Sequence, residues 1–302
     1  MRAARYHQYG EPDVIHIEEV SAPQVPAHGI RIKTRAASVN PVDTILRSGR
    51  AQELLPLELP AIPGRDAAGI VEEVGVDVTG VKVGDAVFGL GGVSDTTAEY
   101  SVLTAWARIP STWSFEQAAA AGLASNTAVR GLDSLGDLKE KTLLIDGAAG
   151  SVGSAAASIA ISRGAKVIGT ANQRNHAFLK SIGVIATPYG PGLAERVAGL
   201  APQGVDVALD AAGAGSLPEL VRITGGPERV TTVADHTAPT IGVRLVNAEN
   251  ESGTLEVAAA LGEAGLYLPR IARSFPLDQT IEAHILAQGA GTQGKVVVAI
   301  SA

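Results

Sequence analysis

A glycine-rich segment at 147–153, Gly-Ala-Ala-Gly-Ser-Val-Gly, is the strongest chemical signal in the chain. It follows an apolar strand predicted over 142–146 and opens a helix predicted over 151–163. In that setting, backbone N–H groups and the helix N-terminus can hold a pyrophosphate. Because the spacing departs from G-x-G-x-x-G, an ordinary strand-to-helix turn of small residues is the alternative. The predicted phosphate contacts are Ala149, Gly150, Ser151, Val152 and Gly153.

The end of the second predicted strand, 165–170, indicates which nicotinamide dinucleotide would bind. NAD sites usually place Asp or Glu about 20 residues after the loop, where the carboxylate binds the ribose 2′-hydroxyl. This chain has no carboxylate over 170–175 and carries Asn172 and Arg174 instead. Asn172 can donate to a 2′-phosphate, and Arg174 can pair with it. We therefore predict NADPH rather than NADH; the alternative is that Arg174 is a solvated residue at a helix start.

The composition excludes several other kinds of site. A length of 302 residues allows about two domains. The absence of cysteine excludes disulfides, iron–sulfur clusters, cysteine nucleophiles and thiolate zinc sites. A net charge of −7 argues against nucleic acid as a partner. No secretory signal and no run of about 18 apolar residues is found, so we expect a soluble cytoplasmic protein with no membrane partner.

The sequence predicts two successive regions that differ in secondary structure. Short, glycine-punctuated strands predict a small barrel or partly open sheet in the first third, at 30–33, 67–74, 85–88 and 99–103. A capping signal at 114–117 precedes a helical run at 118–121. Strands then alternate with helices, which predicts a parallel, doubly wound sheet. Its strands are expected at 142–146, 165–170, 205–209 and 229–233, with helices at 151–163 and 178–182, then a helix at 277–286 and a last strand at 295–300.

Several motifs, taken in order, resemble one known family. The segment 38–43 is similar to an N-P-x-D active-site motif, and 63–71 resembles P-G-x-D-x-x-G-x-V. A G-D-x-V turn at 81–87, a cofactor loop at 148–153 and a closing G-K-x-V strand at 294–297 complete the resemblance, which spans nearly the whole chain. Together these motifs resemble the medium-chain dehydrogenase/reductase superfamily, and within it the zinc-independent quinone oxidoreductase branch.

This resemblance implies an α/β fold with two domains. A GroES-like, β-rich catalytic domain would comprise 1–114 and 253–302, and a Rossmann NADPH-binding domain with a doubly wound parallel sheet would comprise 115–252. Family members are commonly dimers or tetramers and often pair the edge strands of their Rossmann sheets. The resemblance therefore implies a homodimer, with 241–246 as the edge strand.

Two departures from related families narrow the chemistry. Zinc alcohol dehydrogenases of the superfamily have Cys where Asn40 stands, and the chain has no cysteine, so we predict no metal. Many enoyl-thioester reductases carry a tyrosine proton donor after N-P-x-D, whereas 44–51 contains no tyrosine. That difference weakens an enoyl-thioester assignment and leaves the proton donor unidentified.

The resemblance also implies the remaining site residues. Asn40 is the main catalytic candidate, because its amide could donate to a substrate carbonyl or contact the nicotinamide ribose; a turn residue before Pro41 is the alternative. Thr127 is the second catalytic candidate: it resembles the family threonine that faces the nicotinamide carboxamide, and a helix-face hydroxyl is its alternative. Tyr189 is expected against the adenosine. Backbone contacts to the ribose and nicotinamide are expected where later strands end, at Ala212, Gly213, Val233, Ala234 and Asp235.

Three charged residues near these motifs have structural interpretations. We expect Asp43 to accept backbone N–H bonds in its loop and Asp66 to orient neighbouring loops, since a carboxylate would oppose a developing anion. Arg47 could attract a quinone oxyanion, but a surface arginine is the interpretation that we favour.

The sequence therefore predicts an NADPH-dependent, metal-independent oxidoreductase that transfers hydride to a small-molecule quinone or related conjugated carbonyl. One alternative is an NADPH-dependent reductase of the C=C bond of an enone or enoyl compound. A second alternative, from a different class, is a non-catalytic NADPH-binding sensor.

Overall fold

The computed structural model describes residues 1–289 and 292–300, and the chain divides into two units. The first unit comprises Met1–Leu123 and Asn250–Ala302, and the second comprises Ala124–Glu249. Helix α2 (Phe115–Asp133) contains the first boundary between them. The predicted domain boundaries, at 115 and 253, are close to these positions and stay a prediction.

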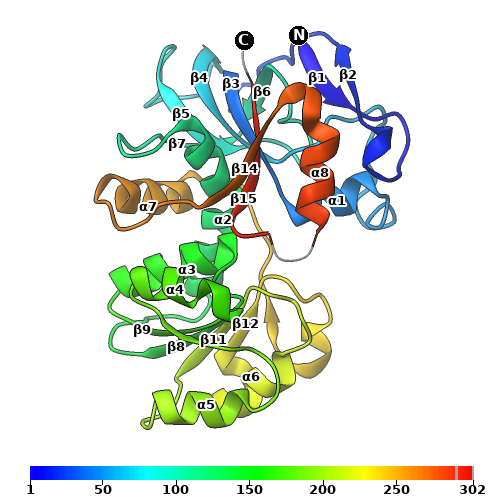
Figure 1. The fold of residues 1–302 in the computed structure, drawn as a ribbon. Helices are drawn as coiled ribbons and strands as arrows, with labels where there is room; N and C mark the ends of the chain where they lie inside the picture. Colours follow the sequence, from blue (N-terminus) through cyan, green and yellow to red (C-terminus); the bar gives the residue numbers. More distant parts are fainter. Residues whose placement is uncertain (290–291, 301–302) are drawn as a thin grey trace. The chain divides into compact units, whose positions relative to one another are not determined.

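A mostly antiparallel sheet forms the core of the first unit (Figure 1). Over the described residues, the unit contains β1 (Arg2–Arg5), β2 (His16–Glu19), β3 (Ile30–Val39), β4 (Asp66–Val74), β5 (Ala86–Leu90), β6 (Tyr100–Leu103), β7 (Ala105–Arg108), β14 (Ile271–Pro276) and β15 (Lys295–Ala299). The strand order is β14-β15-β3-β4-β5-β7, with β6 also paired to β3, and β1 and β2 form a separate ribbon. Ile30 and Ile32 point into the core, as the predicted alternation requires.

A strand from the first forty residues pairs in this sheet with a strand from the last ten. Val296 of β15 lies opposite Val39 of β3 in an antiparallel register. Both side chains belong to one hydrophobic cluster, together with residues of β4 and β14. The last strand therefore brings Lys295 beside the end of β3, where the N-P-x-D motif begins.

Short helices flank the sheet of the first unit. These are α1 (Pro41–Arg47), α7 (Ser252–Glu263) and α8 (Thr280–Gln288). Asn40 is the N-cap of α1, and Pro41 occupies the first helical position, where its fixed φ and missing N–H are tolerated. A 3-10 turn (Leu277–Gln279) precedes α8, so the helix predicted from 277 begins as a 3-10 turn.

A parallel sheet forms the second unit. Over the described residues it contains β8 (Thr142–Asp146), β9 (Lys166–Thr170), β10 (Ile185–Thr187), β11 (Val207–Asp210), β12 (Val230–Thr232) and β13 (Arg244–Leu245). The order β10-β9-β8-β11-β12-β13 reads 3-2-1-4-5-6 along the chain, which is the dinucleotide-binding order. The order reverses between β8 and β11, so a ligand crevice is expected at the carboxyl ends of those two strands.

Helices cover both faces of this sheet, as Figure 1 shows. They are α3 (Ser151–Ser162), α4 (His176–Ser181), α5 (Leu193–Leu200) and α6 (Leu217–Thr224). Ile168 packs in the cluster formed with α5 and α6. Gly169, the next residue of β9, lies against Leu179 of α4, and successive strand residues point to opposite faces. The predicted doubly wound fold is therefore confirmed.

Helix α2 is far longer than the predicted run at 118–121. Its capping signal is confirmed, because Ser114 and Gln117 exchange side-chain and backbone hydrogen bonds of 2.9 and 3.2 Å. The sequence prediction stopped early because glycines usually end helices. Here Gly122 and Gly131 instead give close approach: an added Cβ would lie 2.7 Å from Asp66 Cβ in one case and 3.0 Å from Leu209 Cδ1 in the other.

The edge strand of the parallel sheet is shorter than predicted. The expected strand at 241–246 is wrong in length: Ile241 ends a 3-10 turn (Ala238–Ile241), and only Arg244 and Leu245 pair with β12. β13 is nevertheless the last strand of the sheet order. Pairing of two copies along this edge stays a prediction.

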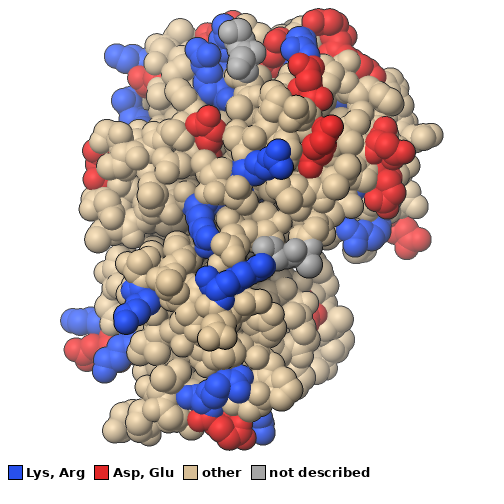
Figure 2. Space-filling view, in the orientation of Figure 1, with Lys and Arg blue, Asp and Glu red and all other residues tan. Residues whose placement is uncertain are grey.

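Helix length and surface charge concern two kinds of partner, a membrane and a nucleic acid. No described helix is long and apolar enough to cross a bilayer. On the face drawn in Figure 2, Lys and Arg side chains are scattered among Asp and Glu and do not form one broad basic surface.

Candidate active site

The glycine-rich loop has the backbone geometry of a phosphate-binding turn. Gly147 has φ +77°, a left-handed conformation that favours glycine. An added Cβ on Gly153 would lie 2.3 Å from the Gly147 carbonyl oxygen, so the first turn of α3 packs directly on the loop backbone. At Gly150, the N-cap of α3, an added Cβ would meet only the Gly147 oxygen, at 3.3 Å. A backbone cradle that a Cβ would partly fill thus lies at the N-terminus of α3, which suits an anionic group.

Polar residues at the strand ends hold this loop. Asp146, the last residue of β8, accepts hydrogen bonds from the hydroxyls of Thr170 and Ser216, the second at 2.6 Å. The Thr170 hydroxyl also accepts from the Gly147 N–H at 3.0 Å. Side chains at the ends of β8 and β9 and at the start of α6 therefore hold the loop in this conformation.

The loops after β11 and β12 are built in the same way. Asp210 accepts from the backbone N–H groups of Ala212 and Gly213 at 2.9 and 3.0 Å. The Thr232 hydroxyl donates to Asp210 at 2.7 Å and accepts from the backbone N–H groups after β12. Each strand thus ends in a polar side chain that orders the loop following it.

These loops lie next to one another at one edge of the sheet. An added Cβ on Gly147 would lie 3.1 Å from Ala212 Cβ, and one on Gly213 would lie 2.9 Å from the Ala234 carbonyl oxygen. The structure therefore brings the predicted contacts of the three loops together: Ala149 to Gly153, Ala212 and Gly213, and Val233 to Asp235. Their roles in binding stay predictions.

Thr127 lies on the part of α2 that belongs to the second unit. Gly131, one turn later, packs against Leu209 of β11 and Val233 after β12. Residues four apart share a helix face, so Thr127 faces the same side as Gly131. Its side chain is buried.

The polar residues after β9 and β10 lie at the same edge of the sheet. Asn172 and Arg174 are exposed, and Asn172 Oδ1 accepts from the Arg174 backbone N–H at 3.3 Å. The amide nitrogen of Asn172 takes no part in that bond. Tyr189, two residues after β10, is 60 % exposed. Both parallel strands end at the edge that carries the glycine-rich loop.

In the first unit, Asn40 is buried in a network of charged groups. Its backbone N–H donates to Asp43 Oδ2 at 2.7 Å. Its side-chain amide donates to Asp66 Oδ1 at 2.9 Å and to Asp43 Oδ2 at 3.2 Å. Lys295 Nζ donates to Asn40 Oδ1. These bonds use both ends of the amide, so a contact with cofactor or substrate would have to replace one of them.

Asp66 links this network to its neighbours. Besides Asn40, its carboxylate accepts from the Ser38 hydroxyl at 2.6 Å and from the Leu123 N–H of α2 at 2.8 Å. Asp66 therefore orients neighbouring segments, and Asp43 accepts one backbone N–H bond, from Asn40; both expectations are confirmed.

Burial changes the protonation of this network. Burial, followed by the charge of Asp66, raises the pKa of Asp43 to about 7. Burial lowers the pKa of the Lys295 ammonium, while Asp66 and Asp43 act in the opposite direction. Two carboxyl groups and one ammonium thus share a desolvated space.

Arg47 is not the surface residue that we predicted. Its side chain is 1 % exposed and donates to Gln288 of α8. Among the described residues, its Nε and Nη1 have no hydrogen-bond partner. Burial lowers the pKa of Arg47, and burial together with Arg47 lowers the pKa of His284 to about 3. The prediction failed because Arg47 lies on the buried face of α1, against α8.

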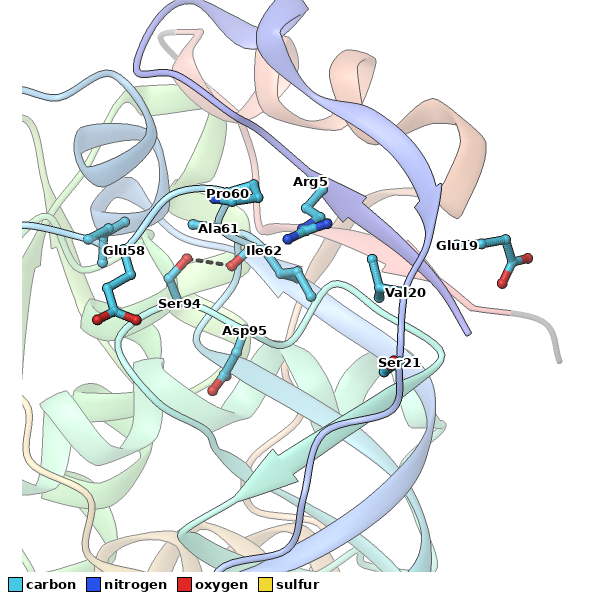
Figure 3. A pocket seen from close by; sticks show the side chains of 11 residues that line it. Arg5, Glu19, Val20, Ser21, Glu58, Pro60, Ala61, Ile62, Ser94 and Asp95 are labelled. Carbon is cyan, nitrogen blue, oxygen red and sulfur yellow. Dashed lines mark hydrogen bonds between the residues drawn. The ribbon is translucent and has the colours of Figure 1, made fainter.

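A cavity of about 720 Å³ opens elsewhere in the first unit (Figure 3). Its walls include Arg5, Glu58 and Asp95, and Ser94 donates to the carbonyl oxygen of Ile62 there. None of the predicted site residues lines it. Sequence reasoning also missed several polar residues that hold the site. Each lies at or next to the end of a strand, and that position was the available signal: Ser38, Asp146, Thr170, Asp210, Thr232 and Lys295.

Comparisons with known proteins agree with this geometry. A family described as alcohol dehydrogenase GroES-like domain matches residues 26–114, and one described as zinc-binding dehydrogenase matches residues 192–298. The quinone oxidoreductase of Homo sapiens is 30 % identical over 334 residues, covering 99 % of this chain and 97 % of that protein. The 2-methylene-furan-3-one reductase of Solanum lycopersicum is 33 % identical over 316 residues, covering 99 % and 79 %.

The fold of this chain is also similar to that of a solved structure. The quinone oxidoreductase from Coxiella burnetii matches with a TM-score of 0.84 and 28 % identity, over 100 % of this chain and 99 % of that one. The chain therefore belongs to the medium-chain dehydrogenase/reductase superfamily, in its quinone oxidoreductase branch. The relatives support an oxidoreductase that uses a nicotinamide cofactor and a small-molecule substrate.

Proposed function

We propose that the protein is an NADPH-dependent, metal-independent oxidoreductase that transfers hydride to a quinone or related conjugated carbonyl. The observation that carries this proposal is the meeting of three loops beside the point where the strand order reverses. The backbone cradle at Gly150, on the N-terminus of α3, fits a dinucleotide pyrophosphate.

The choice of NADPH rests on the end of β9. An exposed arginine and an exposed amide stand there, where NAD sites use a carboxylate. The Arg174 backbone N–H donates to Asn172 Oδ1. The Asn172 amide nitrogen takes no part in that bond and can donate to a phosphate. A 2′-phosphate would take charge-assisted hydrogen bonds from both side chains. A ribose 2′-hydroxyl would find no carboxylate over residues 170–175 to accept its hydrogen bond.

The roles of the chain's own residues follow from their positions. Bound NADPH supplies the hydride. Loop residues Ala149 to Gly153 hold the pyrophosphate, while Tyr189 packs against the adenosine. Backbone groups at 212–213 and 233–235 bind the ribose and nicotinamide, and Thr127 contacts the carboxamide. Asn40 is the catalytic candidate of the first unit. The acceptor gains a hydride from the cofactor and a proton from water, because a hydroquinone is a weak acid.

Reduction of an enone C=C bond is the second candidate. It is supported by the 33 % identity to the 2-methylene-furan-3-one reductase of Solanum lycopersicum. The segment 44–51, which lacks a tyrosine, leaves this reaction without the proton donor that the resemblance would supply. For that reason we place it after quinone reduction.

One assay separates these candidates. The protein is mixed with NADPH or NADH and a panel of quinones and enones, and the loss of nicotinamide absorbance is followed. We expect turnover of quinones with NADPH. Turnover of enones alone would replace the proposal by the second candidate, and tight NADPH binding without any turnover would support a non-catalytic sensor. A preference for NADH would contradict the role given to Asn172 and Arg174.

The assembly and location complete the proposal. We propose a cytoplasmic homodimer that pairs the two copies of β13, since this strand ends the sheet order and Ile241 beside it is 45 % exposed. Light scattering after gel filtration should give the mass of a dimer. The variant Ile241→Asp should shift that mass toward the monomer, and an unchanged mass would move the interface elsewhere.

A further inference from the structure

Lys295 is a lysine in an unusual setting. Its side chain is 6 % exposed, and lysine is almost never fully buried without a partner. It begins β15, which pairs with the end of β3, and it donates to Asn40 Oδ1 from 255 positions away. Lys295 has no role in the proposed binding of cofactor or substrate.

The partners of Asn40 leave its amide only one favourable orientation. On one side, the amide nitrogen faces Asp66 Oδ1 and Asp43 Oδ2, at 2.9 and 3.2 Å. On the other side, the amide oxygen faces the Lys295 ammonium. A flipped amide would set its NH₂ against a cation and its oxygen against two carboxyl groups. In a desolvated space such repulsion is costly.

Lys295 also balances charge. The charges that act on Asp43 include Asp66 of β4 and Lys295 of β15, and both Asp43 and Arg47 of α1 act on the Tyr6 hydroxyl after β1. Tyr6 is buried, and its pKa is raised to about 12, so it stays neutral. Without the ammonium, two carboxyl groups would remain in the buried space with no opposite charge in this set.

We propose that Lys295 is a positioning residue that holds the Asn40 side chain in one orientation and balances the Asp43–Asp66 pair. It thereby keeps the N-terminus of α1, which Asn40 caps, in the conformation that the reaction needs. Lys295 touches Asn40 and acts through it. The kinetic part of this inference rests on the proposed function, while the structural part stands independently.

The test compares three single variants by NMR. Lys295→Met removes the charge and keeps a long apolar side chain, Lys295→Arg keeps the charge, and Lys166→Met is the control. Lys166 is also the first residue of a strand, but it is exposed. The readouts are the side-chain NH₂ signals of Asn40 in asparagine-labelled protein, assigned with Asn40→Ser, and the Asp43 titration in aspartate-labelled protein, assigned with Asp43→Asn.

We expect Lys295→Met to move the Asn40 signals and to raise the pKa of Asp43 by about 1–3 units. Lys295→Arg should lie closer to the wild type, and Lys166→Met should match it. Unchanged Asn40 signals and an unchanged Asp43 titration in Lys295→Met would overturn the proposal. If that variant does not fold, the double variant Asp43→Asn, Lys295→Met keeps the charge balance, and its Asn40 signals are compared with those of Asp43→Asn alone. Identical signals would overturn the proposal.

Kinetics then decide whether the reaction needs this positioning. We expect kcat/KM of Lys295→Met at pH 7 to fall on the order of 10-fold to 100-fold. Because the Asp43 carboxyl group holds Asn40 through two hydrogen bonds, we expect its ionisation to shape the kcat/KM profile, and that limb should move upward with the pKa of Asp43. An unchanged profile in a variant with altered NMR signals would overturn the positioning role. A wild-type protein that turns over no acceptor would refute the proposed function, and the NMR results would then decide the Lys295 proposal alone.

Discussion

Gly153 lies so close to Gly147 that an added Cβ would be 2.3 Å from the Gly147 carbonyl oxygen. Residue Gly153 sits in the first turn of α3, and Gly147 begins the loop that follows β8. Any side chain at 153 must therefore displace the loop backbone, which in turn holds the proposed pyrophosphate cradle.

We expect Gly153→Ala to weaken NADPH binding at least tenfold, because the displaced backbone N–H groups no longer converge on the phosphate. Overpacking should also lower the free energy of unfolding by about 1–3 kcal/mol. Fluorescence titration and urea unfolding measure the two effects. Gly199→Ala in α5 is the control: an added Cβ there meets nothing within 4 Å, and alanine favours a helix. Wild-type affinity in Gly153→Ala would contradict the cradle.

Arg174→Asp should shift the cofactor preference. Loss of a charge-assisted contact with the 2′-phosphate should weaken NADPH binding by about 1–3 kcal/mol, while NADH binding should weaken little or improve. The ratio of the two dissociation constants is the measurement. Lys166→Asp, at the opposite end of β9, makes the same change of charge away from the site. Equal losses in both variants would mean that Arg174 acts only through net charge.

Asp66→Ala should destabilise the first unit strongly. The change leaves the Ser38 hydroxyl, the Asn40 amide and the Leu123 N–H without their acceptor. We expect the free energy of unfolding to fall by about 3 kcal/mol or more. Asp278→Ala is the control, because its ion pair with Arg2 is largely exposed and should contribute about 0–1 kcal/mol. Similar unfolding curves for the two variants would contradict the account of Asp66.

The raised pKa of Asp43 predicts a specific pH dependence of stability. Its ordinary value is 3.8 and its folded value is about 7, so the folded state holds a proton that the unfolded state has lost. The stabilisation is complete below pH 4 and is lost as the pH rises toward 7 and above. The unfolding free energy of the wild type, minus that of Asp43→Asn, should fall on the order of 3 kcal/mol between pH 4 and pH 8.

Urea unfolding at several pH values measures this difference directly. Taking the difference between the two proteins cancels the titration of other groups. Asp77→Asn is the control, because Asp77 and the His28 side chain beside it are both exposed. A difference that stays flat or rises with pH would show that Asp43 is ionised in the folded protein.

Local patterns predicted much of the fold. The strand predicted at 142–146 matches β8, and the predicted βα alternation matches the second unit. Such patterns are readable because each strand buries its own apolar residues and the turn after β8 carries its own glycines. The length of α2 was missed, since its interior glycines serve packing against Asp66 and Leu209 in place of ending the helix.

Contacts between distant residues were not predictable in the same way. Lys295 reads as the first residue of a strand, and only the pairing of β15 with β3 places its ammonium on Asn40. Arg47 reads as a surface residue, because nothing in α1 alone says that α8 will cover it. The buried charges of the first unit are therefore a result of topology, which a single sequence does not display.

The central claim is hydride transfer from NADPH to a quinone, and a kinetic isotope effect tests it most directly. Quinone reduction is followed with NADPH and with NADPH deuterated at the transferring C4 position. The account predicts NADPH oxidation that depends on the quinone and that slows with the deuterated cofactor. No quinone-dependent oxidation of NADPH, while an enone is reduced or no acceptor reacts, would contradict it.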